Sequence, residues 1–349
     1  MPLLSLQQLG WRNALQQQLG SADTGDLQPV RIIGVERSGW LVIGEGGETT
    51  LDPALAASDI GAVTVGDWLL VDADSRARRC LERASLVKRR APGTDRREQL
   101  IAANIDTVFI VSSCNQDFNE ARLERYLAIT HEAGVMPVVV LTKADTSEDP
   151  GSYVAMAARL SPGVVTEAVN ALERGSLACL DAWLGEGQTI ALLGSSGVGK
   201  STITNTLMDD DLIATRDIRE DDARGRHTTT SRHMYRLPAG AWLIDSPGMR
   251  EIQLVDVAGG IDDVFAEVSA LAEQCRFGDC LHESEPGCAV RAAVKAGDIT
   301  DARLARWRKL VREEALNRES IAERRARGKA LGRLYKDTLG ASHARKGRT

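Results

Sequence analysis

The stretch Gly194-Ser-Ser-Gly-Val-Gly-Lys-Ser-Thr202 fits the pattern GxxxxGK[ST], in which a glycine-rich loop binds phosphate groups. It follows the apolar residues 189–193 and precedes the helix-like residues 202–208. The pattern requires this strand–loop–helix context, because backbone N–H groups of the loop and of the helix N-terminus face the phosphates together. The sequence therefore predicts a buried strand, a phosphate loop and a helix in this order.

The residue types of this loop suit its predicted chemistry. Glycines let the backbone turn inward without a Cβ clash. Lys200 is expected to reach the β- and γ-phosphates, which also gives it a catalytic role, and the Ser201 hydroxyl is expected to complete a Mg²⁺ shell. The predicted nucleotide contacts of the loop are Gly194, Ser195, Ser196, Gly197, Val198, Gly199, Lys200, Ser201 and Thr202.

A second motif precedes the phosphate loop and predicts which base is bound. The strand-like residues 137–142 run into Thr142, Lys143, Ala144 and Asp145, a sequence that resembles the guanine-reading motif NKxD. In that motif the aspartate accepts hydrogen bonds from two donors on guanine, and adenine would leave the carboxylate unpaired. Thr142 replaces the usual asparagine, which changes one hydrogen-bonding contact near the base. Residues 169–171 are a candidate second base-side loop.

The motifs that are expected to contact the γ-phosphate and its Mg²⁺ come after the phosphate loop in the sequence. Asp245-Ser-Pro-Gly248 ends a strand-like run and resembles the DxxG loop. There Asp245 would orient a Mg²⁺-bound water and the Gly248 N–H would sense the γ-phosphate. The polar residues 225–230 lie between, where a first switch belongs, and Thr229 is expected to coordinate Mg²⁺ in the GTP state.

The sequence carries no glutamine where many GTPases orient the attacking water. Met249 and Arg250 follow Gly248 at that place. Hydrolysis should therefore be slow, at about 10⁻⁴ to 10⁻² s⁻¹, until a partner helps. His227 is a candidate to supply the missing water contact, and a loop histidine with a structural hydrogen bond is the alternative.

The order of these motifs predicts a rearranged GTPase domain. The base-reading motif normally comes last, whereas here it comes first, which describes a circularly permuted domain whose termini are rejoined at the surface. Strand-like and helix-like segments alternate around the motifs and predict a mostly parallel sheet with helices on both faces. The predicted strands are residues 107–111, 137–142, 164–169, 189–193 and 241–244, and residues 120–133 are a predicted helix.

The N-terminal part has a different pattern. Short β-rich runs with glycine turns and no intervening helix predict a small β-barrel. The runs are residues 31–35, 40–43, 48–51, 67–72 and 81–88. The polar residues 16–26 are typical of a flexible lead-in, and residues 91–94 of a linker.

Three cysteines and a histidine cluster in the C-terminal part. Cys275, Cys280, His282 and Cys288 give the spacing C-x4-C-x-H-x5-C. Three thiolates and one imidazole fill the tetrahedral shell of a structural zinc and leave no open position for catalysis. Beyond the cluster, residues 299–327 predict a helix with a core face that includes Leu304 and Val311 and a solvated basic face.

Composition narrows the classes of function. The chain has 349 residues, 43% of them hydrophobic, and a net charge of −6, which indicates an ordinary globular protein. No apolar run is long enough to cross a bilayer and no secretory signal is present, so we expect a cytoplasmic protein. Basic residues concentrate in residues 76–97 and in residues 303–349. These two patches are either a footprint for a polyanion or solvated faces.

The succession of a β-barrel, a permuted GTPase domain and a Cys3His segment resembles the RsgA family of small-ribosomal-subunit biogenesis GTPases. Residues 99–106, residues 225–230 and the zinc spacing are further points of similarity. The resemblance implies an OB-fold on rRNA, GTP hydrolysis stimulated by the small ribosomal subunit late in its maturation, and a zinc domain as a further contact. The expected domains are an extension (1–29), the OB-fold (30–92), the GTPase domain (93–258) and a helical zinc domain with a basic tail (259–349).

Two other functions remain open at this point. A zinc-dependent RNA-binding regulator would keep the nucleotide site only as a structural element. An ATP-using phosphotransferase would lack an aspartate placed as Asp145 is. We expect a monomer that binds no membrane.

Overall fold

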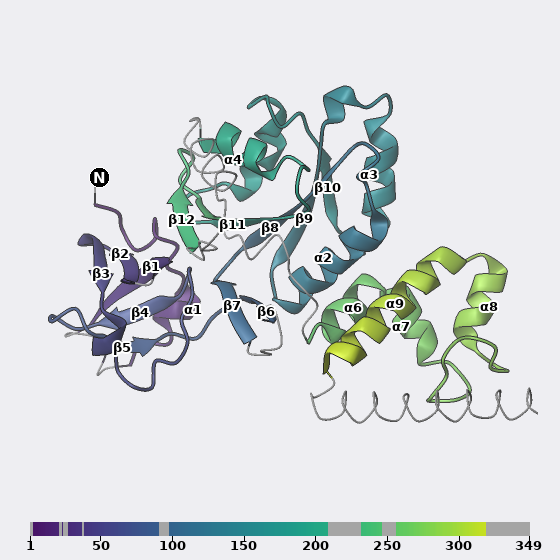
Figure 1. The fold of residues 1–349 in the computed structure, drawn as a ribbon, viewed down its shortest axis with the longest axis horizontal. Helices are drawn as coiled ribbons and strands as arrows, with labels where there is room; N and C mark the ends of the chain where they lie inside the picture. Colours follow the sequence, from purple (N-terminus) through teal and green to yellow (C-terminus); the bar gives the residue numbers. More distant parts are fainter. Residues whose placement is uncertain are drawn as a thin grey trace, which may run out of the picture.

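The computed structural model describes residues 3–20, 23, 27–36, 38–90, 98–208, 232–245 and 256–318. Three parts follow one another along the long axis of the molecule (Figure 1). They are an N-terminal set of β-strands, a central sheet with helices, and a group of C-terminal helices. None of the helices in these residues combines the length and apolar character that spanning a bilayer requires.

Five antiparallel strands form the N-terminal part, in the pairing order β3-β2-β1-β4-β5. Their apolar side chains, among them Ile32, Val42 and Leu69, pack into one buried cluster. Within the described residues no pairing joins β3 to β5, so the closure of a barrel stays a prediction. The strands are β1 (Gln28–Glu36), β2 (Gly39–Gly44), β3 (Gly47–Leu51), β4 (Trp68–Val71) and β5 (Ala77–Cys80).

The predicted strand at residues 81–88 is wrong in its first half. Only β6 (Leu86–Arg90) is a strand, and it pairs with β7 (Glu98–Ala103) in a separate two-stranded sheet. The preceding residues use side-chain hydrogen bonds instead of a strand ladder. The Ser85 hydroxyl donates to the Ile105 carbonyl and accepts from its N–H, both at 2.8 Å. A local pattern of apolar residues does not reveal such partners.

The central sheet confirms the predicted parallel arrangement. Its strands run in the order β10-β9-β8-β11-β13, all parallel, and β12 (Arg232–Arg236) pairs antiparallel with β13. Because β12 also pairs antiparallel with β1, the N-terminal strands continue the same sheet. The parallel strands are β8 (Thr107–Ser113), β9 (Met136–Thr142), β10 (Val165–Ala168), β11 (Thr189–Leu193) and β13 (Trp242–Asp245).

Helices cover both faces of the central sheet. Alternate strand residues belong to two separate cores, so that Ile110 packs toward α2 and its neighbour Phe109 toward α4 and η3. Strands buried on both faces read as continuous apolar runs, which is why these strands were predictable. The helices of the N-terminal and central parts are α1 (Asn13–Gln16), η1 (Pro53–Leu55), α2 (Glu120–Glu132), η2 (Ala144–Thr146), α3 (Pro150–Ala158), η3 (Ser176–Trp183) and α4 (Lys200–Met208).

The C-terminal helices pack against α2 (Figure 1). The approach of α6 to α2 is so close that a Cβ atom on Gly260 would lie 1.9 Å from the Ala128 carbonyl oxygen. Any larger residue at position 260 would push the two helices apart. The helices are α6 (Ala258–Val264), α7 (Ala266–Ala272), α8 (Ala289–Ala296) and α9 (Asp301–Arg318).

A buried ion cluster fixes α9 on α2. Glu124 of α2 is fully buried, and its carboxylate accepts from Arg303 and Arg306 at 2.8 Å each. The expectation of a solvated basic face on α9 is therefore wrong for Arg303, which is 8% exposed. The prediction that Val311 lies on the core face is also wrong, because this side chain is 38% exposed. A buried carboxylate on another helix supplies the reason, because it can neutralise an arginine inside the protein.

The N-terminal segment is packed rather than flexible over its described residues. Leu9 is fully buried, and the Gln8 carbonyl accepts a 2.9 Å hydrogen bond from the Trp242 indole of β13. Gly187 has a φ of +72°, and a Cβ atom there would lie 2.3 Å from the Gln7 carbonyl oxygen. The stretch at residues 16–26, predicted to be a flexible lead-in, is held to the rest of the protein at Asp23, which pairs with Arg79 at 2.8 Å. The Gln18 side chain also binds the backbone of Glu82 at 2.7 and 3.1 Å.

One buried arginine of β1 joins this strand to the N-terminal segment and to β11. Arg31 of β1 is 1% exposed and donates at 2.7 Å to the Leu9 carbonyl and to the Thr189 hydroxyl of β11. Its guanidinium also lies 5.7 Å from the centre of the Trp68 ring. Burial lowers the pKa of Arg31 to about 10, so the side chain stays charged at neutral pH.

We predict that Arg31→Met lowers the free energy of unfolding by about 2–4 kcal/mol, because the substitution leaves buried oxygens without a donor. Urea denaturation of the full chain measures the effect. Arg76→Met is the matched control, since the Arg76 side chain is 46% exposed. Equal unfolding midpoints for the two variants would contradict a structural role for the buried junction.

Candidate functional site

The phosphate loop lies between β11 and α4, as the sequence predicts. α4 begins at Lys200, so its first turn opens toward the loop. The Lys200 ammonium donates to the carbonyls of Gly194, at 2.7 Å, and Ser195. The loop therefore holds its lysine beside the backbone that is expected to surround phosphate groups.

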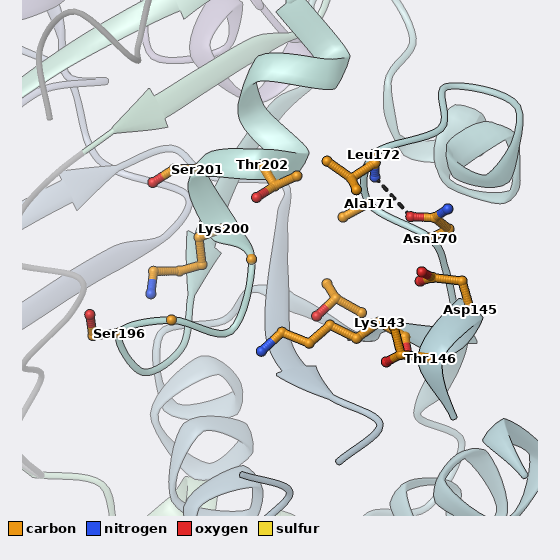
Figure 2. A pocket seen from close by; sticks show the side chains of 13 residues that line it. Lys143, Asp145, Thr146, Asn170, Ala171, Leu172, Ser196, Lys200, Ser201 and Thr202 are labelled. Carbon is orange, nitrogen blue, oxygen red and sulfur yellow. Dashed lines mark hydrogen bonds between the residues drawn. The ribbon is translucent and has the colours of Figure 1, made fainter. Parts of the chain in front are cut away.

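The loop with the base-reading motif follows β9. Lys143 adopts a left-handed conformation with a φ of +59°, and the one-turn helix η2 then carries Asp145. The Ala144 N–H donates to the Val169 carbonyl at 3.2 Å, which holds this loop next to the end of β10. In Figure 2 the Lys143 side chain extends from the Asp145 side toward the phosphate loop.

A single cavity of about 560 Å³ joins the two loops. Asp145 lies at one side of the cavity, and Lys200 and Ser196 lie at the other (Figure 2). The residues that line it are Thr142, Lys143, Asp145, Thr146, Asn170, Ala171, Leu172, Ser196, Gly197, Gly199, Lys200, Ser201 and Thr202. The carboxylate and the ammonium thus face one space rather than two.

Thr142 ties the base-side loop to the phosphate loop. It is fully buried, and its hydroxyl lies 2.6 Å from the Val198 carbonyl and 3.1 Å from the Ser112 carbonyl. Gly199 passes so close that a Cβ atom there would lie 3.2 Å from this hydroxyl. The residue that departs from the NKxD pattern therefore still provides a hydrogen bond, and that bond goes to the backbone of the phosphate loop.

The third wall of the cavity comes from the candidate second base-side loop. The Asn170 side chain accepts from the Leu172 N–H at 3.1 Å (Figure 2), and the Thr206 hydroxyl of α4 donates to the Ala171 carbonyl at 2.7 Å. Sequence reasoning did not assign Leu172 or Thr146 to the site. Leu172 is 76% exposed beside the cavity, and a single leucine in a polar loop gave no signal.

The other predicted site residues differ in their placement. Gly194, Ser195, Val198 and Ala144 belong to the two loops but do not line the cavity. Asp245 ends β13, the parallel neighbour of β11, so its backbone lies at the same edge of the sheet. Gly248, His227 and Thr229, with the first-switch residues 225–230, lie outside the described residues.

The Cys3His residues come together as a possible metal centre. One ligand atom from each of Cys275, Cys280, His282 and Cys288 lies within 4.8 Å of the others. The Cys275 and Cys288 sulfurs are 3.8 Å apart and lie 3.5 and 3.4 Å from the His282 Nδ1. A tetrahedron with ordinary Zn–S and Zn–N bonds has edges of about 3.8 and about 3.6 Å. The donor set and its spacing therefore fit zinc.

The surroundings of the cluster hold its ligand loop in place. The Glu285 carboxylate accepts from the N–H groups of Leu281, Glu283 and Ser284 at 2.8–3.0 Å. The backbone N–H of Glu285 itself, and then these three N–H groups, lower the pKa of the Glu285 carboxyl to about 2. Burial lowers the pKa of His282, which favours the neutral imidazole that a metal requires. The loop can thus present its ligands without a large rearrangement.

Two solved structures share the fold. The first is YjeQ from Thermotoga maritima, with a TM-score of 0.62 and 20% identity, covering 84% of this chain and 100% of that one. The second is YloQ, described as a circularly permuted GTPase, with a TM-score of 0.59 and 19% identity, covering 86% and 99%. At this identity the likeness concerns the fold, and it confirms the permuted GTPase arrangement predicted from the motif order.

Relatives with higher identity extend over most of the chain. The small ribosomal subunit biogenesis GTPase RsgA 2 of Vibrio parahaemolyticus is 48% identical over 334 residues, 96% of this chain and 92% of the relative. The small ribosomal subunit biogenesis GTPase RsgA of Mesorhizobium japonicum is 49% identical over 317 residues, 90% and 91%. The family model described as RsgA GTPase matches residues 80–255. This chain is therefore a member of the RsgA GTPase family.

Proposed function

We propose that this protein hydrolyses GTP and acts in late maturation of the small ribosomal subunit, which stimulates it. The observation that carries the proposal is the single cavity lined by both Asp145 and Lys200. At one end of the cavity the Asp145 carboxylate can accept hydrogen bonds from a base with two adjacent N–H donors. At the other end the Lys200 ammonium and the glycine-rich backbone can bind phosphates. Two relatives that are 48% and 49% identical and are named small ribosomal subunit biogenesis GTPases support the biological role.

The remaining catalytic assignments are proposals from the sequence. Ser201 and Thr229 would hold Mg²⁺, which shields the charge of the phosphates when it is bound. Asp245 would orient a water on that ion, and Gly248 would contact the γ-phosphate. His227 would orient the attacking water or make a structural hydrogen bond in its loop.

The proposed rRNA contact rests on the N-terminal strands and the zinc domain. Strands β1 to β5 would form an OB-fold over residues 30–92, and residues 259–349 would form the zinc domain. The number of basic residues in the sequence overstates the basic surface, however, because aspartates of the same part of the chain pair with some of the arginines. Arg78 pairs with Asp72 at 2.5 Å and Arg83 with the buried Asp67 at 2.6 Å. The surface left for a polyanion is smaller than the sequence predicts.

We further propose that the chain works as a monomer in the cytoplasm, with one structural zinc and Mg²⁺ bound with GTP. The GTPase domain would comprise residues 93–258, and residues 1–29 would be an N-terminal extension before the OB-fold. A closed set of four protein ligands favours a structural rather than a catalytic role for the zinc.

The proposal is tested by phosphate release from GTP and from ATP, each with and without purified small ribosomal subunits. We expect turnover of GTP alone at about 10⁻⁴ to 10⁻² s⁻¹, a rise of at least about tenfold with subunits, and background rates with ATP. Zinc-dependent RNA binding without GTP turnover would favour the regulator instead. Equal use of ATP and GTP would favour a phosphotransferase.

We predict that Asp145→Asn weakens GTP binding by roughly 10- to 100-fold, because the amide accepts only one of the two guanine hydrogen bonds. The same variant should gain affinity for XTP, since xanthine presents one donor and one carbonyl at this edge. Fluorescence competition titrations measure both affinities. Asp149→Asn is the control, because Asp149 caps α3 away from the cavity and asparagine caps equally well. Unchanged GTP affinity in Asp145→Asn would remove Asp145 from base recognition.

We predict one zinc ion per chain in the parent protein and a clear loss of zinc in Cys288→Ser, because a hydroxyl is a poor zinc ligand. Elemental analysis after dialysis against a chelator gives the content, and thermal unfolding reports the accompanying loss of stability. Cys179→Ser is the control, since Cys179 is exposed and outside the cluster. If Cys288→Ser retained the parent's zinc content, the assignment of the centre would be wrong.

A further inference from the structure

An arginine outside the known motifs contacts the phosphate loop. Arg122 lies in the first turn of α2, and one terminal guanidinium nitrogen donates to the Ser195 hydroxyl at 2.7 Å. The contact follows from the topology, because β8 precedes α2 and is the parallel neighbour of β11. The start of α2 and the phosphate loop therefore lie at the same edge of the sheet.

The charge of Arg122 is not neutralised by a nearby carboxylate among the described residues. Among the described residues the guanidinium has one hydrogen-bond partner, the neutral Ser195 hydroxyl, and the rest of the side chain is exposed. The charge of the next arginine of α2 is neutralised, because Arg125 forms a bidentate ion pair with Glu313 in which both distances are 2.6 Å. Arg122 thus places a cationic group without a described carboxylate partner beside the loop that is expected to hold phosphates.

The contact is at the phosphate end of the cavity. Ser195 directly precedes Ser196, which lines the cavity, and the Ser195 carbonyl accepts from the Lys200 ammonium. The base-side carboxylate, Asp145, lies on the opposite side (Figure 2). Two cationic side chains, Lys200 and Arg122, therefore hold the same residue of the loop, one through its carbonyl and one through its hydroxyl.

The helix that carries Arg122 is firmly held. Asn119 caps it by accepting from the Arg122 N–H at 2.9 Å. On another face, the fully buried Glu124 binds Arg303 and Arg306 of α9 at 2.8 Å each. The backbone that carries Arg122 is therefore fixed relative to the phosphate loop, and the Ser195 hydroxyl holds its guanidinium there. Charges that are already in place stabilise a developing charge most effectively.

We propose that Arg122 is a positioning residue for GTP hydrolysis, which holds the phosphate loop through Ser195 and adds positive charge beside the bound triphosphate. The inference rests on the proposed GTPase function. In the reaction the water oxygen bonds to the γ-phosphorus, and the bond from that phosphorus to the β–γ bridging oxygen breaks. The electron pair stays on GDP, and phosphate and a proton are released. Positive charge at the loop favours both triphosphate binding and this transfer of negative charge.

The test compares Arg122→Ala, Arg122→Lys, Ser195→Ala and the Arg122→Ala/Ser195→Ala double variant with the parent in the full chain. Single-turnover GTP hydrolysis and the affinities for GDP and a non-hydrolysable GTP analogue are measured. Arg159→Ala is the matched control, an exposed arginine at the end of α3 that does not line the cavity. Urea denaturation verifies that every variant is folded.

We expect Arg122→Ala to lower the hydrolysis rate by about tenfold or more and to weaken the GTP analogue more than GDP. Arg122→Lys should recover part of both losses, because it restores the charge without the planar guanidinium. The double variant should be little worse than Arg122→Ala, since the two residues act through one contact.

Two results would overturn the inference. One is an unchanged rate and an unchanged preference for the triphosphate in Arg122→Ala. The other is equal weakening of GDP and the GTP analogue with no rescue by lysine, which would indicate a purely structural contact. A parent protein that neither binds nor hydrolyses GTP would instead refute the proposed function, so the two failures are distinguishable.

Discussion

The parallel pairing of β8, β9 and β11 is the constraint on which the site depends. Parallel strands end at one edge of the sheet, so the loops that follow them meet there although they are distant along the chain. The base-side loop follows β9, the phosphate loop follows β11, and α2 begins after β8. The buried Thr142 hydroxyl then joins two of these loops through the Val198 carbonyl. Circular permutation leaves this geometry intact because it changes the order of the strands in the chain and not their neighbours.

Helix α2 links the cavity beside the phosphate loop to the C-terminal helices. Its first turn contacts the phosphate loop, and its buried Glu124 holds two arginines of α9. Removing one member of such a cluster leaves an unpaired charge inside the protein, which is strongly destabilising. The C-terminal helices are thus fixed on the same element that faces the phosphate loop, and the N-terminal strands are fixed on β11 through Arg31.

Strands and motifs were predictable wherever the pattern was local. The continuous apolar runs of β8, β9 and β11 and the cysteine spacing each carry their own signal, and the structure agrees with them. Expectations that depended on partners elsewhere were wrong. The lead-in at residues 16–26 was expected to be flexible, but Gln18 and Asp23 bind Glu82 and Arg79, which lie far along the chain. Arg303 was expected in solvent, but a distant glutamate neutralises it.

By itself the sequence determined the residue patterns of this protein: a GxxxxGK[ST] loop, a motif that resembles NKxD, a Cys3His set and the permuted order that arranges them. Only the tertiary structure decided that Asp145 and Lys200 share one cavity, that Thr142 bridges its two loops and that Arg122 contacts Ser195. The physical reason is that motifs arise from residues adjacent in the chain. Contacts between loops instead depend on which strands pair, and the pairing is set by the packing of the whole sheet.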